Sequence, residues 1–230
     1  MSTDKPTGVD TYNATIERIE TVADGLSIFF IRPDTPIPGR LPGHYVSIGL
    51  VGPDGKKLIR RPYSLSQSLG PAADPDLLEL LIIRVPEGDL TPILFDQNEG
   101  DRLFVRPKMV GTYLLPKLDA DMTLILTSTG TGVAPHMTML ETCVDTCKQV
   151  VMMECVRYSA ELAYAEQIRQ FQQTHPNLVY ISLVTREGGA KRYIQDYFRD
   201  GILEKEHGVS IAPETTHVFA CGNPAMIGIP

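Results

Sequence analysis

The feature that most constrains the fold is a change of rhythm along the chain near residue 120. Before it, short β-rich runs alternate with turn residues, a pattern typical of an antiparallel barrel or sandwich. These runs cover residues 12–19, 26–32, 44–50, 58–65, 77–84 and 102–105. After it, strands alternate with helices, which is typical of a parallel sheet with helices on both faces. The sequence therefore predicts two domains: an N-terminal antiparallel β-barrel of the Greek-key kind over residues 1–115, and a C-terminal α/β domain with a parallel sheet over residues 116–230.

The two predicted domains differ in their helices. In the first, one helix is indicated, because Thr91 is suited to cap it, Pro92 to its first position and Gly100 to the end of the stretch. In the second, strands over residues 122–127, 149–156, 178–185 and 217–221 alternate with helices over residues 135–148, 160–175 and 191–203. We expect these three helices to be the crossover connections of the sheet.

Composition limits the possible partners. Lys and Arg number 21 and Asp and Glu 28, so the net charge is −7. A nucleic-acid or anionic membrane surface would need strong clustering of the basic residues, and only small clusters occur. No apolar run approaches the ~18 residues of a membrane span, and the chain starts without an apolar signal region. We therefore expect a cytoplasmic protein with no membrane span and no nucleic-acid partner.

The cysteines indicate neither a disulfide framework nor a cluster. Cys143, Cys147, Cys155 and Cys221 form no C-x-x-C pair. They also lack the C-x4-C-x2-C spacing of a plant-type iron–sulfur protein. The five histidines are scattered and form no H-E-x-x-H motif. We expect reduced thiols and no bound metal, so any redox chemistry would need another cofactor.

A glycine-rich turn follows the first strand of the second domain and leads into a helix. It consists of Thr129, Gly130, Thr131 and Gly132. Glycines let backbone amides approach an anion, and the helix N-terminus adds partial positive charge, so a pyrophosphate would be held here. Pro135 takes the place of the third glycine of G-x-G-x-x-G, and such a turn alone is more often structural than ligand-binding.

Three arginines favour the interpretation of the glycine-rich turn as a ligand-binding site over a purely structural one. Arg157 ends the second strand of the domain, Arg186 ends the third, and Arg192 follows six residues later. A parallel sheet places its ligand crevice at these strand ends. Guanidinium groups suit the 2′-phosphate that distinguishes NADP from NAD, although each arginine taken singly is read as a solvated surface residue. Glu154 lies near Arg157 but inside the strand, where it is equally suited to be an ion partner.

The first domain carries a second motif, Arg61-Pro62-Tyr63-Ser64, on its fourth strand. Alternation along a strand places Arg61 and Tyr63 on one face, where a cation and a flat aromatic ring suit the phosphate and ring of one long ligand. Ser64 lies on the other face or at the edge, in reach of a ring nitrogen. The alternative for an isolated motif is an exposed arginine beside a packed tyrosine.

Together these motifs resemble the signatures of the ferredoxin–NADP reductase family. Three of them occur in the family's order, at residues 61–64, 130–135 and 221–226. Stretches at residues 85–91 and 156–164 further resemble its compact bacterial branch, the ferredoxin/flavodoxin–NADP reductases. The resemblance spans nearly the whole chain and implies a flavoprotein oxidoreductase that binds FAD in the first domain and NADP in the second.

The resemblance also implies roles for individual residues. As catalytic residues, Tyr63 stacks on the isoalloxazine ring, Ser64 touches its N5 region and Cys221 borders the nicotinamide. Arg61 and the segment 88–91 receive the FAD pyrophosphate. The cofactor-binding residues implied in this way are Arg61, Pro62, Tyr63, Ser64, Gly88, Leu90, Thr91, Thr129, Gly130, Thr131, Gly132, Arg157, Arg186, Arg192 and Gly222.

Two features depart from the family pattern. His136 stands where the family usually has an aromatic residue after Ala-Pro. The family also continues past Cys-Gly-Asn-Pro with a helix and a segment that covers the flavin, whereas ten residues run here from Cys221 to Pro230. We therefore expect the natural protein to extend further, or this form to have lost that cover.

The implied reaction passes a hydride from NADPH to FAD and then single electrons to a carrier such as ferredoxin or flavodoxin. Lys56, Lys57, Arg60 and Lys108 are candidates for the patch that meets an acidic carrier, and a solvated hairpin is the alternative for them. Two other functions stay open: an NADH-dependent reductase component of an oxygenase, and a non-catalytic flavin or nucleotide sensor. The missing cysteine pattern and the three arginines count against the oxygenase component.

Overall fold

The computed structural model describes residues 11–69, 74–188 and 191–228. By its internal contacts the chain forms two compact units. Unit 1 consists of Met1–Ser66 and Asp74–Leu114. Unit 2 consists of Gln67–Ala73 and Leu115–Pro230. Because the chain leaves unit 1 after Ser66 and returns at Asp74, a short stretch between two of its strands is part of the second unit.

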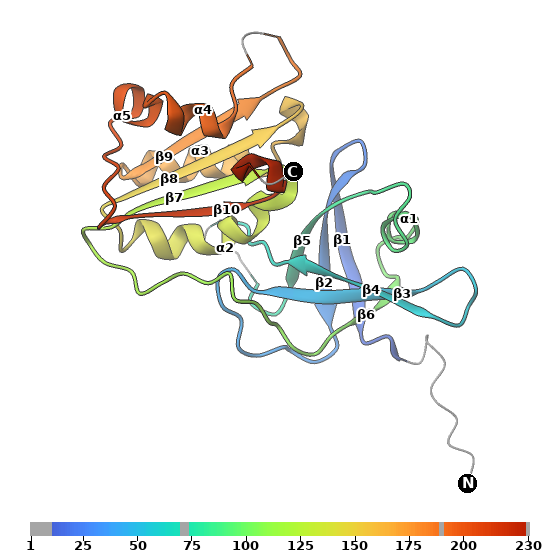
Figure 1. The fold of residues 1–230 in the computed structure, drawn as a ribbon. Coiled ribbons are helices and arrows are strands. Elements are labelled where there is room, and N and C mark those ends of the chain that lie inside the picture. The colour runs from blue at the N-terminus through green and yellow to red at the C-terminus, as the bar shows by residue number, and fades with distance from the viewer. Residues whose placement is uncertain (1–10, 70–73, 189–190, 229–230) are drawn as a thin grey trace. The chain divides into compact units, whose positions relative to one another are not determined.

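Unit 1 is an antiparallel barrel (Figure 1). Its strands are β1 (Ala14–Ala23), β2 (Leu26–Pro33), β3 (Tyr45–Val51), β4 (Leu58–Ser64), β5 (Leu78–Ile83) and β6 (Arg102–Val105). They are ordered β4-β3-β6-β1-β2-β5, and all neighbouring pairs are antiparallel. A bridge between Ser66 and Glu79 connects the two ends of this sheet, which closes it. The predicted fold class of the first half is confirmed.

The interior of the barrel follows from alternation along the strands. Val46 and Ile48 of β3 are fully buried, whereas Tyr45 is exposed and Ser47 is only partly buried. The short helix α1 (Thr91–Phe95) adds Leu94 to this core, and Phe95 contacts Phe29 edge-on, with ring centroids 5.4 Å apart. Aromatic rings favour this geometry because the positive edge of one meets the negative face of the other.

One expectation about α1 is wrong. Leu90, not Thr91, occupies the N-cap position, and no side chain caps the helix. The Thr91 hydroxyl instead accepts a hydrogen bond from the Val85 amide at 2.9 Å and donates one to the Val85 carbonyl at 3.1 Å. It thereby closes the turn before the helix, so its bonding capacity is used by its own loop.

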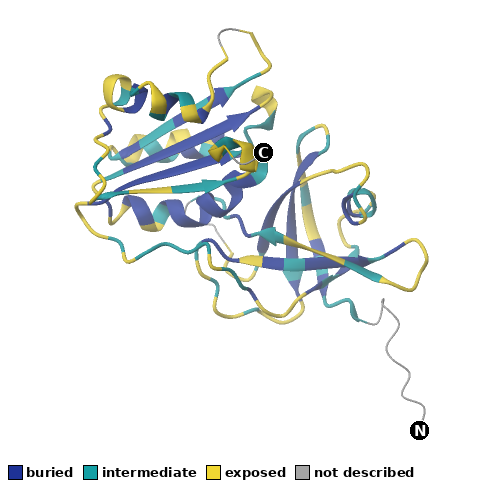
Figure 2. Ribbon diagram, viewed as in Figure 1, coloured by how far each residue is buried: buried dark blue, intermediate teal, exposed yellow. Residues whose placement is uncertain are grey.

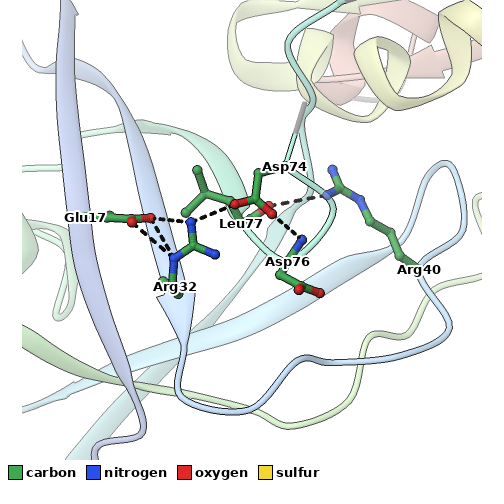
Figure 3. Close-up of polar contacts among 6 residues, drawn as sticks. All are labelled: Glu17, Arg32, Arg40, Asp74, Asp76 and Leu77. Carbon is green, nitrogen blue, oxygen red and sulfur yellow. Dashed lines mark hydrogen bonds and ion pairs between the residues drawn. The ribbon is translucent and has the colours of Figure 1, made fainter. Parts of the chain in front are cut away.

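Two arginines hold the chain where it leaves and re-enters the barrel, and Figure 3 shows their contacts with Asp74 and Leu77 on the return side. Arg32 of β2 forms ion pairs with Glu17 of β1 at 2.9 Å and with Asp74 at 2.7 Å. Arg40 donates hydrogen bonds to the carbonyls of Ser66 at 2.6 Å and Leu77 at 3.4 Å. Hydrogen bonds from a cation to backbone carbonyls are stronger than neutral ones, so both ends of the excursion are held to unit 1.

Unit 2 is a parallel sheet with helices on its faces (Figure 1). Its strands β7 (Thr123–Thr129), β8 (Gln149–Val156), β9 (Leu178–Val184) and β10 (Thr216–Cys221) are ordered β10-β7-β8-β9, and every neighbouring pair is parallel. The helices are α2 (Val133–Val144), α3 (Ala165–Thr174), α4 (Ile194–Arg199) and α5 (Ile202–His207). Short 3-10 turns lie at Gly130–Gly132, Ser159–Glu161 and Pro224–Ile227. The predicted α/β class is confirmed.

The sheet of unit 2 is covered unevenly (Figure 2). The central strands β7 and β8 are buried nearly throughout, as expected for strands covered on both faces. On one face Val151 and Met153 pack with Ile194 and Leu203 of α4 and α5, while α2 packs on β7 and β8 and α3 on β9. The edge strand β10 is half-exposed, and Val218 is 51% exposed.

Two predicted helices are shorter than expected. The stretch 160–175 begins with the 3-10 turn Ser159–Glu161, and α3 starts only at Ala165. The stretch 191–203 starts as a helix at Ile194 and is divided at Gly201, whose φ of 63° is left-handed and ends a helical run. None of the helices in the described ranges is long and apolar enough to cross a membrane.

Candidate functional site

The glycine-rich turn lies where β7 passes into α2. Gly130 has a φ of 54°, a left-handed conformation that glycine adopts without steric cost. Gly130–Gly132 form a 3-10 turn that runs directly into the helix at Val133. Because the first amides of a helical run have no partner within it, this turn presents donors at the carboxyl edge of the sheet. The structure therefore places Thr129, Gly130, Thr131 and Gly132 where the sequence predicted an anion-binding turn.

A second loop closes against this turn. A β-carbon on Gly132 would lie 2.1 Å from the Cys221 carbonyl oxygen, and one on Gly222 would lie 2.1 Å from Thr129 Oγ1. The amide of Asn223 donates a hydrogen bond to Thr129 Oγ1 at 2.7 Å. Both glycines thus permit the ends of β7 and β10 to touch. The result is a cradle of backbone with little side-chain bulk, which fits the phosphates of a nucleotide.

Two of the three predicted arginines meet at the adjacent strand ends. Arg157 follows β8 and Arg186 follows β9, and the Arg186 amide donates to the Arg157 carbonyl at 2.9 Å. The Arg157 guanidinium is half-exposed and forms an ion pair with Glu161 at 2.9 Å. The Glu161 carboxylate also accepts a hydrogen bond from the Arg157 backbone amide at 2.9 Å, so the two residues together form a rigid turn. A phosphate that binds Arg157 would share the guanidinium with this carboxylate.

The third arginine has a different setting. Arg192 precedes α4 and forms an ion pair with Glu206 of α5 at 3.8 Å. Tyr158 and Tyr193 directly follow Arg157 and Arg192 and are 44% and 43% exposed. Exposed aromatic rings beside basic residues suit the stacking of a nucleotide base. Sequence reasoning missed both tyrosines, although their position immediately after a predicted phosphate-binding arginine was the available signal.

Two polar residues near this edge do not reach it. Glu154 is fully buried inside β8, so it is not placed to bind a ribose hydroxyl from the surface. His136 is fully buried in α2, and burial lowers its pKa to about 3. A buried imidazole with so low a pKa is neutral at physiological pH. The residue in the place of the family's aromatic side chain therefore belongs to the interior of the helix layer.

On unit 1, the motif of β4 is arranged as its alternation predicts. Arg61 and Tyr63 lie opposite Ile48 and Val46 of β3 and so share one face of the strand, on which Arg61 is exposed and Tyr63 is partly buried. Tyr63 packs against the barrel core, and burial raises its pKa to about 12. Its hydroxyl therefore stays protonated over the physiological range. Ser64 lies on the opposite side of the strand, in register with the partly exposed Tyr45.

Arg61 meets a second predicted segment. Its guanidinium forms an ion pair with Asp89, between Gly88 and Leu90. Leu90 is buried, and a β-carbon on Gly88 would lie 3.1 Å from the Val85 carbonyl oxygen. With Thr91 also bonded to Val85, the side chains of this segment maintain its turn. A phosphate bound here would meet backbone amides and the Arg61 guanidinium. Pro62, which lacks an amide hydrogen, lies in β4 at the end of the sheet order.

Comparison with known proteins identifies the class. A family model described as an oxidoreductase NAD-binding domain matches residues 126–229. The flavodoxin/ferredoxin–NADP reductase of Buchnera aphidicola subsp. Schizaphis graminum is 32% identical over 178 residues, which are 75% of this chain and 68% of the relative. The ferredoxin–NADP reductase of Pseudomonas aeruginosa is 33% identical over 197 residues, 80% of this chain and 74% of the relative.

A solved structure agrees with these relatives in fold. The ferredoxin NADP+ reductase from Neisseria gonorrhoeae, with bound FAD and NADP, has a TM-score of 0.80 and 20% identity, and the match covers 94% of this chain and 87% of that one. The chain is an oxidoreductase of the two-domain reductase fold. It belongs to the flavodoxin/ferredoxin–NADP reductase family.

Proposed function

We propose that this protein is an FAD-dependent oxidoreductase that passes electrons between NADPH and a one-electron carrier such as ferredoxin or flavodoxin. The observation that carries the proposal is the backbone cradle of Gly132 and Gly222 beside Arg157 and Arg186 at one edge of the parallel sheet. Family membership supports the same activity. FAD is assigned to the barrel of residues 1–115 and NADP to residues 116–230.

On the dinucleotide side, each residue has a separable task. Thr131 and Gly132, with Thr129 and Gly130, offer the turn that receives the pyrophosphate. Arg157 and Arg186, with Arg192 nearby in the sequence, receive the 2′-phosphate by charge-assisted hydrogen bonds. Cys221 and Gly222 are assigned to the nicotinamide end. Burial raises the pKa of the Cys221 thiol, so it is neutral there and does not act as a nucleophile.

On the flavin side, Arg61 compensates the charge of the pyrophosphate, and its pairing with Asp89 orients the guanidinium beforehand. The turn that contains Gly88, Leu90 and Thr91 contributes backbone donors. Tyr63 supplies an aromatic face and Ser64 a hydroxyl for the ring system. Because Tyr63 is partly buried against the barrel core, it offers a fixed surface for stacking.

The chemistry divides between cofactor and protein. FAD, when bound, supplies the exchange between a two-electron hydride donor and one-electron carriers. The residues of this chain bind, orient and exclude water, and hydride transfer requires no general acid or base from them. This agrees with the groups at the two sites, since Tyr63 stays protonated and the Cys221 thiol stays neutral.

The experiment that tests the proposal is an anaerobic titration of the purified protein with NADPH and, separately, with NADH, followed by flavin absorbance. We expect copurified FAD and its bleaching by NADPH at lower concentration than by NADH. Bleaching by NADH alone would favour an oxygenase reductase component. Protein that takes up FAD but is bleached by neither dinucleotide would contradict the proposed activity.

A further inference from the structure

Glu154 is a buried carboxylic acid with an unusual setting in the middle of unit 2. It lies on the central strand β8, opposite Ser128 of β7 and Ser182 of β9. Its side chain is fully buried. The Tyr180 hydroxyl donates a hydrogen bond to Oε2 at 2.8 Å, whereas Oε1 has no hydrogen-bond partner among the residues that the structure describes. A buried, half-satisfied carboxyl group is costly when ionised, so its presence calls for a reason.

The groups around Glu154 only partly compensate a negative charge. From β9 comes the neutral hydroxyl of Tyr180, and from α3 the Arg169 guanidinium, 5.8 Å from the centre of the Tyr180 ring. Both favour the ionised carboxylate, and burial, the larger effect, raises the pKa of Glu154 to about 7. The other titratable side chains buried in β8 and the neighbouring elements are Cys155 on β8, His136 and Cys143 on α2, Cys147 just after α2, Tyr164 at the start of α3 and Tyr197 on α4.

Glu154 is also close to the proposed dinucleotide site. Ser128, one strand spacing away at about 4.8 Å, immediately precedes the glycine-rich turn. Arg157 lies three residues later, directly after the end of β8, roughly 10 Å along the strand direction. No ligand contact is needed for coupling at such distances, because a buried charge is poorly screened by solvent.

We propose that Glu154 is a proton-linked positioning residue of the dinucleotide site: NADP(H) binding draws a proton from solvent onto the Glu154 carboxyl group, and its ionisation weakens binding. This inference rests on the proposed function. The physical reason is repulsion between the buried carboxylate and the phosphates held at the ends of β7 and β8. By linkage, if loss of the proton from Glu154 weakens dinucleotide binding, then bound dinucleotide must raise the affinity of Glu154 for that proton. At a separation of roughly 10 Å, repulsion between the carboxylate and the phosphates makes the Kd for the dinucleotide roughly tenfold higher when Glu154 is ionised than when it is protonated.

The test is calorimetric titration of the FAD-loaded protein with NADP+ at about pH 6, 7 and 8, each in two buffers of different ionisation enthalpy. The difference between buffers gives the protons taken up per dinucleotide. The 2′-phosphate itself titrates near pH 6, so the quantity to compare is wild type minus Glu154→Gln, in which the ligand's own protons cancel. We expect the wild type to take up a larger fraction of a proton near pH 7, and its Kd to rise with pH more steeply than that of the variant.

Two further variants sharpen the result. Tyr180→Phe removes the hydrogen bond that favours the ionised carboxylate, so the pH of maximum uptake moves upward. Glu204→Gln, which changes an exposed glutamate of α5, behaves as wild type. Equal proton uptake by wild type and Glu154→Gln would overturn the proposal. If Glu154→Gln does not fold, the proposal is tested with Tyr180→Phe alone. A pH of maximum proton uptake that is the same in Tyr180→Phe and in the wild type would then overturn the proposal. Failure of the wild type to bind NADP+ at any pH would instead contradict the proposed function.

Discussion

Gly132 and Cys221 approach each other so closely that a β-carbon on Gly132 would lie 2.1 Å from the Cys221 carbonyl oxygen. The contact joins the turn after β7 to the end of β10, two segments almost ninety residues apart in the sequence. A glycine in a predicted phosphate-binding turn is usually explained by the ligand. Here the glycine is required by the packing of the protein itself, and the ligand benefits from the cradle that results.

The first prediction concerns this contact. Gly132→Ala forces the turn and the end of β10 apart, and overpacking of this kind costs about 1–3 kcal/mol. We expect a lower melting temperature together with weaker NADPH binding, measured by thermal unfolding and by flavin bleaching. Gly208→Ala is a contrasting control, since Gly208 has a left-handed φ of 64° with no atom within 4 Å of the added β-carbon, whereas Gly132 has an ordinary helical φ of −62°. The control tests backbone strain without a clash. If Gly132→Ala has the same melting temperature as the wild type, the end of β10 moves away from the added methyl group without cost, and the prediction is wrong.

The second prediction concerns the choice of dinucleotide. Arg157→Ala removes a charge-assisted hydrogen bond to the 2′-phosphate, which corresponds to about a ten- to hundredfold loss of NADPH affinity. NADH lacks that phosphate, so its kcat/KM should change little. Steady-state kinetics with both dinucleotides measures the difference. Arg199→Ala, an exposed arginine that pairs with Asp196 and Asp200, serves as control. Equal losses for NADPH and NADH would refute the assignment.

The third prediction uses the pairing of Arg61 with Asp89. If Arg61 binds the FAD pyrophosphate, Arg61→Ala leaves that anion poorly compensated and also leaves Asp89 as a nearby negative charge. We expect substoichiometric FAD after purification and an unchanged far-ultraviolet circular dichroism spectrum. Asp89→Asn keeps the guanidinium and removes the competing carboxylate, so FAD is retained.

The two variants separate a binding role from a structural one. A surface ion pair contributes little to stability, and a pair that served only to hold the loop would respond similarly to the loss of either partner. Matching FAD contents in Arg61→Ala and Asp89→Asn, measured as the ratio of flavin to protein absorbance, would therefore contradict the binding role of Arg61.

Much of the fold could be predicted because it depends on local patterns. The residues of β6 and β8 are those expected from their apolar runs. The helices were less predictable where a local turn competes with the helical period. At Ser159–Glu161 the Glu161 carboxylate bonds back to the amides of Arg157 and Tyr158, which favours a tight turn over an immediate α-helix.

The candidate site shows the same division. The motifs that stand together in the sequence, such as the glycine-rich turn and the β4 motif, were recognisable before the fold was known. The pairing of Arg61 with Asp89 and the closure of Gly222 on Thr129 depend on which strands become neighbours, and no local pattern states that. The burial of Glu154 was also ambiguous, because its strand position was evident but the layers covering it were not.

The fourth prediction concerns the electron carrier and rests on the proposed function. Lys56 and Lys57 are exposed on the β3–β4 hairpin. Their backbone amides donate hydrogen bonds to the Asp54 carboxylate at 3.0 and 3.2 Å. Replacing both lysines by Gln should slow association with reduced ferredoxin at low salt and have less effect at high salt, because screening removes electrostatic steering. Stopped-flow association rates over a range of salt measure this. A rate loss that is the same at every salt concentration would argue against steering.

The fifth prediction is the dependence of stability on pH that Glu154 imposes, independent of any ligand. Burial raises its pKa from 4.5 to about 7, so below 4.5 the group is protonated in both the folded and the unfolded chain. Between these values the unfolded chain releases the proton while the folded chain keeps it. Stability therefore falls as pH rises through this window and does not fall further above it. The full effect is about 3 kcal/mol.

Other carboxylates titrate in part of the same range, so the informative quantity is the difference in melting temperature between wild type and Glu154→Gln at each pH. The amide cannot ionise and occupies nearly the same volume, which removes the titration without opening a cavity. We expect the wild type to lose stability relative to the variant steadily from about pH 4.5 to 7, and the difference to level off above pH 7. A difference that stays constant across this window would mean that Glu154 ionises in the folded protein as it does in the unfolded chain. The carboxyl group would then have a partner or water access that offsets its burial.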